Sequence, residues 1–264
     1  MGSQGVGMLV LSLFPGIGLL DMAFEEEGFC VVRGPDLLWG GDIRRFHPPA
    51  RKFDGVIGGP PCQAFSPLAQ AARMGLNRLA EDLTPEFSRC IRAARPGWFL
   101  MENVVGAPLP DIDGYHIDSL VVNNRWFGAE QNRRRRFTFG STRPLVNMKS
   151  ARTHPATLAN PWRRLEVVAL EAVDVVPCVT ASGTQWERDT IGKSGRKGRS
   201  RSDRSVKALV NYIRWQGLPD DFLSDAPCTV EGKVRMVGNG VPLPMGLAIA
   251  RAVKSAILQT SEAT

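Results

Sequence analysis

Three groups of side chains in this sequence could do covalent or acid–base chemistry. Cys62 follows the run Gly58–Pro61, Glu102 follows the apolar segment 98–101, and arginines occupy all of 133–136. A thiol can act as a nucleophile, and a carboxyl group among apolar neighbours can hold a raised pKa and donate a proton. Arginine forks match a pyrimidine carbonyl or a phosphate. Each feature alone is also explained by a small buried hydrophobe, an exposed acid or a solvated strand edge.

A glycine turn is a candidate of another kind. The segment Phe14–Gly18 reads Phe-Pro-Gly-Ile-Gly and lies between an apolar run and a helical pattern. Glycines let the backbone approach a ligand, and the following helix offers free N–H donors. Both a nucleotide-like cofactor site and a tight turn needed only for packing are consistent with this segment.

The apolar pattern predicts the elements that position these residues. Strand, helix and strand alternate, which predicts a parallel sheet with covering helices. Because ligands bind at the carboxyl edge of such sheets, Cys62 and Glu102 are expected at the binding edge. The predicted strands are 8–13, 29–32, 53–57 and 98–101, and the predicted helices are 19–27 and 81–94.

The second half of the chain departs from this alternation. Only about 16 residues separate Met101 from the next predicted strand near Leu120, which leaves room for a loop but not for a full crossover helix. A further strand is predicted at 135–140, and a helix at 243–258. Mobile or partly disordered loops are predicted at 68–78 and 183–204, the second rich in Gly, Ser, Arg and Lys.

The arginine run has two faces if it is extended. Arg133 and Arg135 then project to one side, and Arg134 and Arg136 to the other. One pair could face the site while the other meets solvent or phosphate.

Composition limits the possible classes of protein. Five widely spaced cysteines without a CxxC pair, and three histidines without metal-ligand spacing, argue against disulfides and a metal site and favour a reduced, cytoplasmic setting. The formal net charge is +7, and residues 133–214 hold 18 Lys and Arg against 6 Asp and Glu, which suits a polyanion partner or a solvated basic face. No apolar run approaches the roughly 20 residues that span a bilayer.

Taken together, the motifs resemble the DNA (cytosine-5) methyltransferase family. The resemblance covers nearly the whole chain except about 144–205. The matching segments, in the family's order, are LFPGIG (13–18), GDI (41–43), GGPPCQAFS (58–66), MENV (101–104), QNRRRRF (131–137), QGLPDDF (216–222) and GNGVP (238–242).

The resemblance implies a methyl transfer from S-adenosylmethionine to C5 of a flipped-out cytosine in double-stranded DNA, which yields 5-methylcytosine and S-adenosylhomocysteine. Cys62 would be the nucleophile, activated by a lowered pKa near the arginines. Glu102 would bond the cytosine N3 and amine, Arg135 the O2, and Arg133 would hold the loop around Cys62. The implied cofactor residues are Phe14, Gly16, Ile17, Gly18, Asp36, Asp42, Ile43, Pro61, Leu83, Asn239 and Val241.

The sequence departs from the family pattern in a few places. Leu19 stands where a second glycine is more usual, and Asp36, the nearest match to the ribose-binding acid, has an unusual spacing. The segments before GDI and after MENV are also short.

These features predict an α/β protein with two lobes. Residues 1–143 and 235–264 would form a mostly parallel, Rossmann-like methyltransferase sheet, and 144–234 a small target-recognition lobe. We expect a monomer on DNA, without a membrane or a metal. An RNA-directed member of the same family and a catalytically silent nucleic-acid-binding fold are the alternatives, and the target sequence is not predicted.

Overall fold

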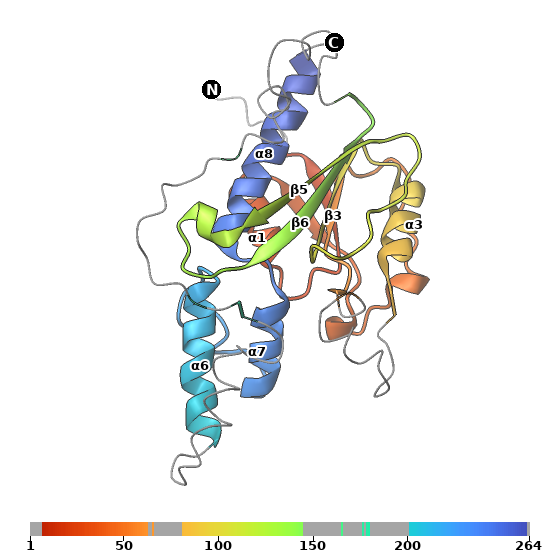
Figure 1. Cartoon of the computed structure of the whole chain (residues 1–264). Coiled ribbons are helices and arrows are strands. Elements are labelled where there is room, and N and C mark those ends of the chain that lie inside the picture. Colours follow the sequence, from red (N-terminus) through yellow and green to blue (C-terminus); the bar gives the residue numbers. More distant parts are fainter. Residues whose placement is uncertain are drawn as a thin grey trace, which may run out of the picture.

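The computed structural model describes residues 7–62, 65, 81–144, 165, 176, 178–179 and 201–262. The predicted loop at 68–78 and most of the predicted arm at 183–204 lie outside these residues. Within them the chain forms one six-stranded sheet with helices on both faces (Figure 1).

The sheet is parallel in one half and antiparallel in the other. Its strand order is β2-β1-β3-β4-β6-β5. The strands β1, β2, β3 and β4 run parallel to one another, whereas β6 is antiparallel to both β4 and β5. The bounds are Leu9–Leu13 (β1), Cys30–Arg33 (β2), Gly55–Gly58 (β3), Trp98–Asn103 (β4), His116–Asn123 (β5) and Arg134–Ser141 (β6).

Helices cover the two faces unequally. Helices α1 (Leu19–Glu26) and α8 (Leu243–Glu262) pack on one face, around Phe24, Trp98 and Phe137. Helix α3 (Thr84–Ala94) covers the other face through Phe87 and Ile91. This three-layer arrangement confirms the predicted α/β class, because each apolar sheet face is buried by an amphipathic helix.

The connections explain why only half of the sheet is parallel. Between β4 and β5 the chain has no helix, as its length predicted, and short 3₁₀ turns η1 (Leu37–Trp39) and η2 (Ile43–Arg45) replace a helix between β2 and β3. Strand β5 begins at His116, earlier than expected. The turn η4 (Asn124–Phe127) then returns the chain as β6 alongside β5.

Two glycines make room for large rings in the sheet core. A Cβ on Gly55 would lie 2.1 Å from the indole of Trp98, its partner across β3 and β4. A Cβ on Gly140 would lie 2.2 Å from the ring of Phe99, its partner across β4 and β6. Neither ring could lie flat over its neighbouring strand if that glycine carried a side chain.

A pair of helices lies beyond the carboxyl ends of the parallel strands (Figure 1). Helix α6 (Arg201–Trp215) and helix α7 (Val230–Asn239) pack together around Leu209, Tyr212 and Val237. The prediction of a loop through residue 204 was wrong at its last four residues, because α6 begins at Arg201. Its apolar residues recur at helical spacing, a signal masked by the basic residues among them.

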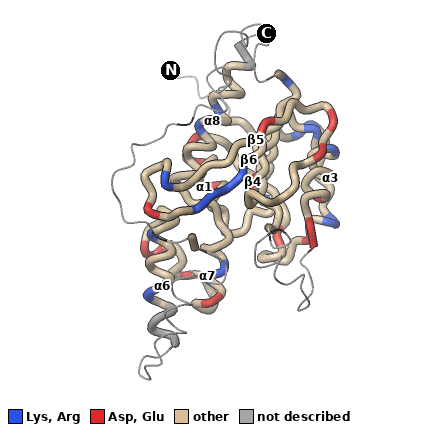
Figure 2. Tube along the Cα trace, viewed as in Figure 1, with Lys and Arg blue, Asp and Glu red and all other residues tan. Residues whose placement is uncertain are grey.

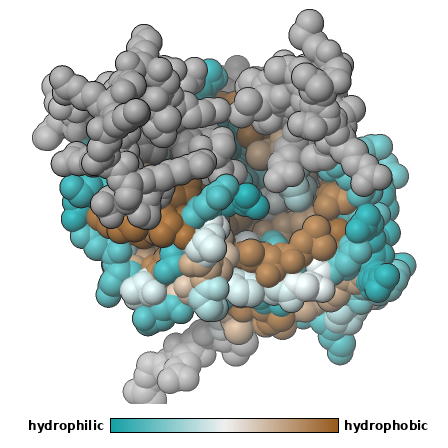
Figure 3. Space-filling view, turned by 90° about the horizontal axis from the view of Figure 1, so that it is seen from below, coloured by the Kyte–Doolittle hydropathy of each residue, from teal (hydrophilic) through white to brown (hydrophobic). Residues whose placement is uncertain are grey.

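The space-filling view of this end shows apolar residues in patches between hydrophilic ones (Figure 3). The predicted lobe boundary between 234 and 235 falls within α7, and the division into lobes stays a prediction.

One stretch, Val230–Gln259, is long and apolar enough by composition to cross a membrane, with an 18-residue window of mean hydropathy 1.4. The sequence analysis found no such run. Half of its apolar window is buried inside the protein, and Gly240 to Pro242 separate α7 from α8 within it. These features are those of a core helix, which passes the same test.

Candidate active site

Cys62 lies in the turn that follows β3, at the carboxyl edge of the sheet. Its carbonyl oxygen accepts from the Phe65 N–H at 2.9 Å. The Asn103 side chain, at the end of β4, donates to the Pro60 carbonyl at 3.3 Å and so ties the two strand ends together. The turn is therefore anchored on both sides of the half-buried thiol.

Glu102 points into the same edge from β4. It is part of the strand rather than following it, since β4 extends to Asn103. The Arg135 Nε lies 3.0 Å from its Oε1, and both side chains are largely buried. A Cβ on Gly59 would lie 3.1 Å from Glu102 Oε2, so the missing side chain leaves room for the carboxylate.

The antiparallel register explains the pairing of Glu102 with Arg135. Phe137 on β6 is directly opposite Glu102 on β4. Arg135 is two residues from Phe137 and therefore shares its face of the strand. Arg136 points the other way and donates to the Ala107 carbonyl at 2.8 Å, while Arg134 is exposed. The basic run crosses the middle of the molecule at the start of β6 (Figure 2).

Burial and the two arginines act on the pKa values of Glu102 and Cys62 in opposite directions. Burial raises the pKa of Glu102, and the charges of Arg135 and Arg133 oppose that rise. The pKa of the Cys62 thiol is also raised, first by burial and then by the Glu102 carboxylate, against the pull of the two arginines. The predicted lowering of the thiol pKa was therefore wrong, because desolvation and the Glu102 charge outweigh the two arginines.

Replacing Glu102 by glutamine is expected to lower the pKa of the Cys62 thiol. A carboxylate nearby disfavours the thiolate, and its loss also releases Arg135 to act on the sulfur. The rate at which methyl methanethiolsulfonate modifies Cys62, followed across pH by peptide mass spectrometry, should then rise several-fold at neutral pH. Glu81→Gln is the control, because Glu81 pairs with Arg44. An unchanged pH profile in Glu102→Gln would contradict the coupling.

Arg133 bonds to backbone carbonyls at the end of α7, and its role in holding the loop around Cys62 stays a prediction, since residues 63–64 and 66–80 lie outside the described part of the chain. Its side chain is 1% exposed and donates to the carbonyls of Val179 (2.5 Å), Gly238 (3.0 Å) and Gly240 (2.8 Å). Among the described residues, none of its hydrogen bonds reaches the Cys62 turn. Burial lowers its pKa to about 10, so the guanidinium stays charged at neutral pH and acts on Cys62 and Glu102 through its field.

The glycine turn adopts left-handed backbone conformations. Phe14, Gly16 and Gly18 all have positive φ, of 55°, 56° and 80°. A Cβ on Gly16 would meet no atom of the described residues within 4 Å, so they leave open space beside this glycine. Ile17 is half-buried between the two glycines. Glycine relieves most of the steric cost of this conformation.

Asp36 lies beside this turn in spite of its unusual spacing. One carboxylate oxygen accepts from the Gly16 N–H at 2.9 Å and the other from the Leu38 N–H at 2.8 Å. Each oxygen keeps a lone pair for a further donor. Asp36 follows β2, so it reaches the turn after β1 from the neighbouring strand.

The remaining predicted cofactor residues surround the same edge. Asp42 caps η2, and hydrogen bonds from Arg44 lower the pKa of its carboxyl group. Ile43 and Leu83 are buried in the cluster beneath α3, and Pro61 is half-buried beside Cys62. Asn239 is exposed and Val241 is buried, at the corner between α7 and α8.

A buried acid beneath the glycine turn was not predicted. Asp21, on α1, is 1% exposed and accepts from the Ser12 hydroxyl at 2.5 Å and from Arg33 at 3.0 Å. Burial raises its pKa, against the bonds from Ser12 and Arg33. These contacts join α1, β1 and β2 under the turn. The only sequence signal was an acid within the first turn of a helix, which is common.

Comparisons with known proteins identify the family of the chain. The family described as C-5 cytosine-specific DNA methylase matches residues 40–188, which is more than half of the chain. The match includes Cys62, Glu102 and both Arg133 and Arg135.

The chain belongs to the C-5 cytosine-specific DNA methylase family.

Its curated relatives are longer proteins. The type II methyltransferase M.NgoPII of Neisseria gonorrhoeae is 29% identical over 169 residues, which cover 52% of this chain and 49% of the relative. M.FnuDI of Fusobacterium nucleatum is 31% identical over 167 residues, with 52% and 48% covered. The chain thus spans about half the length of the curated relatives that it matches.

The fold of the chain is also found in solved structures. The Entamoeba histolytica methyltransferase EhMeth superposes with a TM-score of 0.59 at 12% identity and covers 97% of this chain and 99% of its own. This likeness extends the shared fold beyond the family match. In the described part of the chain, no group of three or more His, Cys, Asp or Glu side chains could hold a metal ion.

Proposed function

We propose that this chain transfers a methyl group from S-adenosylmethionine to C5 of cytosine in DNA through a covalent Cys62–C6 adduct. The observation that carries the proposal is the meeting of Cys62, Glu102 and Arg135 at one edge of the sheet. The open glycine turn lies at the carboxyl end of β1, which is next to β3 in the sheet.

In the proposed reaction the Cys62 thiolate forms a bond to C6 while Glu102 holds a proton at N3. The ring electrons move toward C5, which becomes nucleophilic enough to accept the methyl group. Loss of the C5 proton and elimination of Cys62 then restore the aromatic ring and the free thiol. Arg135, bonded to Glu102, is close enough to its carboxylate to orient it and to contact the cytosine O2.

The residues around the glycine turn fit S-adenosylmethionine. Positive φ angles and the open space above Gly16 allow close approach of a ligand, and Asp36 keeps acceptor capacity for ribose hydroxyls. Ile43, Pro61 and Leu83 would provide apolar contacts, while Asp42, Asn239 and Val241 would complete the pocket. When bound, the cofactor supplies an electrophilic methyl group, and S-adenosylhomocysteine is the product.

Double-stranded DNA is the proposed substrate. The reacting carbon is inaccessible in a stacked duplex, so the base must be flipped out. The excess of positive charge in 133–214 would bind phosphates, and the small lobe at 144–234 would read the sequence. We propose that the protein acts as a monomer in the reducing cytoplasm, in contact with DNA and without a membrane.

The test is methyl transfer from labelled S-adenosylmethionine to unmethylated genomic DNA and, in parallel, to tRNA. We expect label in DNA, at cytosine C5 within a short fixed context that sequencing of the product would reveal. Label in tRNA but not in DNA would overturn the DNA substrate in favour of RNA. Binding of cofactor without transfer to either would favour a catalytically silent nucleic-acid-binding protein.

A further inference from the structure

One buried glutamine brackets the corner between α7 and α8, residues 237–243. Gln216 follows α6 and is 0% exposed. Its side-chain Nε2 donates to the carbonyls of Val237 (2.5 Å) and Gly240 (3.4 Å). Its main-chain carbonyl accepts from the Leu243 N–H at 2.9 Å. One residue therefore bonds to the last turn of α7, to the bend and to the first residue of α8.

The same corner is also bonded to Arg133, the residue that precedes β6. Arg133 donates to the carbonyls of Gly238 and Gly240, so Gly240 accepts from both Arg133 and Gln216. Carbonyls at the end of α7 carry partial negative charge and suit a cationic donor. Two polar side chains, one just before β6 and one just after α6, thus hold a segment that contains two glycines and a proline.

The corner lies directly against the glycine turn. A Cβ on Gly240 would lie 2.4 Å from Leu19 Cδ1, and Leu19 immediately follows Gly18. Leu19 stands where a second glycine is more usual, and its side chain fills the space that the missing Cβ of Gly240 leaves. Any shift of the corner would press on Leu19 and thus on the turn. Asn239 and Val241 belong to this corner.

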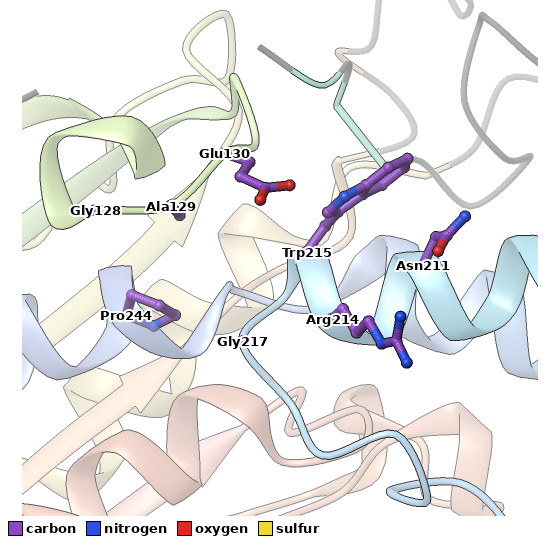
Figure 4. Close-up of a pocket in the computed structure, with 8 residues that line it drawn as sticks. All are labelled: Gly128, Ala129, Glu130, Asn211, Arg214, Trp215, Gly217 and Pro244. Atoms are coloured by element: carbon purple, nitrogen blue, oxygen red, sulfur yellow. The ribbon is translucent and has the colours of Figure 1, made fainter. Parts of the chain in front are cut away.

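We propose that Gln216 is a positioning residue for the cofactor site, which it serves by clamping residues 237–243 against the glycine turn. The inference rests on the proposed function, because the site it organises is the one assigned to S-adenosylmethionine. Gln216 itself is buried and would touch no ligand. Its neighbours Trp215 and Gly217 line a surface hollow of about 470 Å³ (Figure 4). Gln216 itself is fully buried and does not line this hollow.

Gln131 offers a matched comparison. It is also a glutamine of 0% exposure, and its Nε2 donates to the Trp215 carbonyl at 3.0 Å. Each of the two side chains has an Oε1 without a hydrogen-bond partner among the described residues. Gln131 therefore ties the segment before β6 to the end of α6, and it is as buried as Gln216. Within the described part of the chain, its side chain makes no hydrogen bond to the corner.

The test compares Gln216→Met with Gln131→Met. Methionine keeps the length of glutamine and removes both hydrogen-bonding groups, so the two variants should lose similar thermal stability. We expect Gln216→Met to raise the Kd for S-adenosylhomocysteine, measured by titration calorimetry, about ten-fold, or about 1.4 kcal/mol. Gln131→Met should change it less than about two-fold. The KM for S-adenosylmethionine should rise in the same proportion, with little change in the KM for DNA.

An unchanged Kd in Gln216→Met, or an equal loss in both variants, would overturn the proposal. If Gln216→Met does not fold, hydrogen exchange in the wild type decides. Addition of S-adenosylhomocysteine should slow exchange of the Leu243 amide, which lies in the corner and donates to the main-chain carbonyl of Gln216. Unaltered exchange there would show that the corner is not coupled to the cofactor site and would refute the proposal. A wild type that does not bind S-adenosylhomocysteine would instead refute the proposed cofactor, and the inference with it.

Discussion

Replacing Cys62 by alanine is expected to reduce methyl transfer by at least roughly 10⁴-fold, since loss of a nucleophile removes the whole covalent route. The charges of Glu102, Arg133 and Arg135 all act on the half-buried thiol. Alanine removes the sulfur without adding volume or charge, so the cofactor pocket should stay intact. We expect S-adenosylhomocysteine to bind Cys62→Ala within about three-fold of the wild type.

A trapping experiment tests the same residue without turnover. With DNA that carries 5-fluorocytosine, the final loss of a proton from C5 is blocked, so the adduct should persist as a complex that survives denaturing electrophoresis. Wild type should form it and Cys62→Ala should not. Cys30→Ala is the matched control, because Cys30 is exposed on the edge strand β2. Full activity or a trapped complex in Cys62→Ala would exclude Cys62 as the nucleophile.

The second large effect concerns stability. Arg133→Met is expected to lower the free energy of unfolding by about 3 kcal/mol, because the carbonyls of Val179 and Gly238 lose a buried donor. Removing the charge relieves the cost of burying it, which offsets part of that loss. The carbonyl of Gly240 keeps its bond from Gln216. The loss of these donors to buried carbonyls therefore outweighs the gain from removing a buried charge, and the net change in the free energy of unfolding is a decrease.

Urea unfolding of Arg133→Met and Arg134→Met measures this effect. Arg134 is the next residue of the same run, but its side chain is exposed, so its replacement should change stability by less than about 0.5 kcal/mol. Arg133→Lys should fall between the two, because an ammonium cannot reach carbonyls on three sides as a guanidinium fork does. Equal stabilities for Arg133→Met and Arg134→Met would show that the buried bonds contribute nothing.

The local patterns in the sequence were sufficient for the first half of the fold. Strands and helices up to Met101 alternate with clear apolar spacing and glycine boundaries, and the structure has them within a few residues. The apolar spacing was harder to recognise where many charged residues lie between the apolar ones. In α6 the basic residues led to a prediction of loop at 201–204, although Leu209, Tyr212 and Ile213 recur on one face. Helix α7, with two glycines, was not predicted.

Contacts distant in sequence account for what was missed at the site. Gln216 and Gly240 are 24 residues apart, and Arg133 and Gly240 are 107 apart. No spacing rule connects such positions. The motif around Gln131 indicated four arginines with alternating faces, yet could not say that Arg133 would turn toward α7 while Arg135 reached Glu102.

By itself, the sequence determined the family, the parallel half of the sheet and the identity of Cys62, Glu102 and Arg135 as candidates, because reactive residue types at strand ends follow from local pattern. Only the tertiary structure decided how protons and charges are distributed among them. Burial raises the pKa of both Cys62 and Glu102 in spite of two arginines. Desolvation depends on everything packed around a group, and that packing exists only once distant segments have come together.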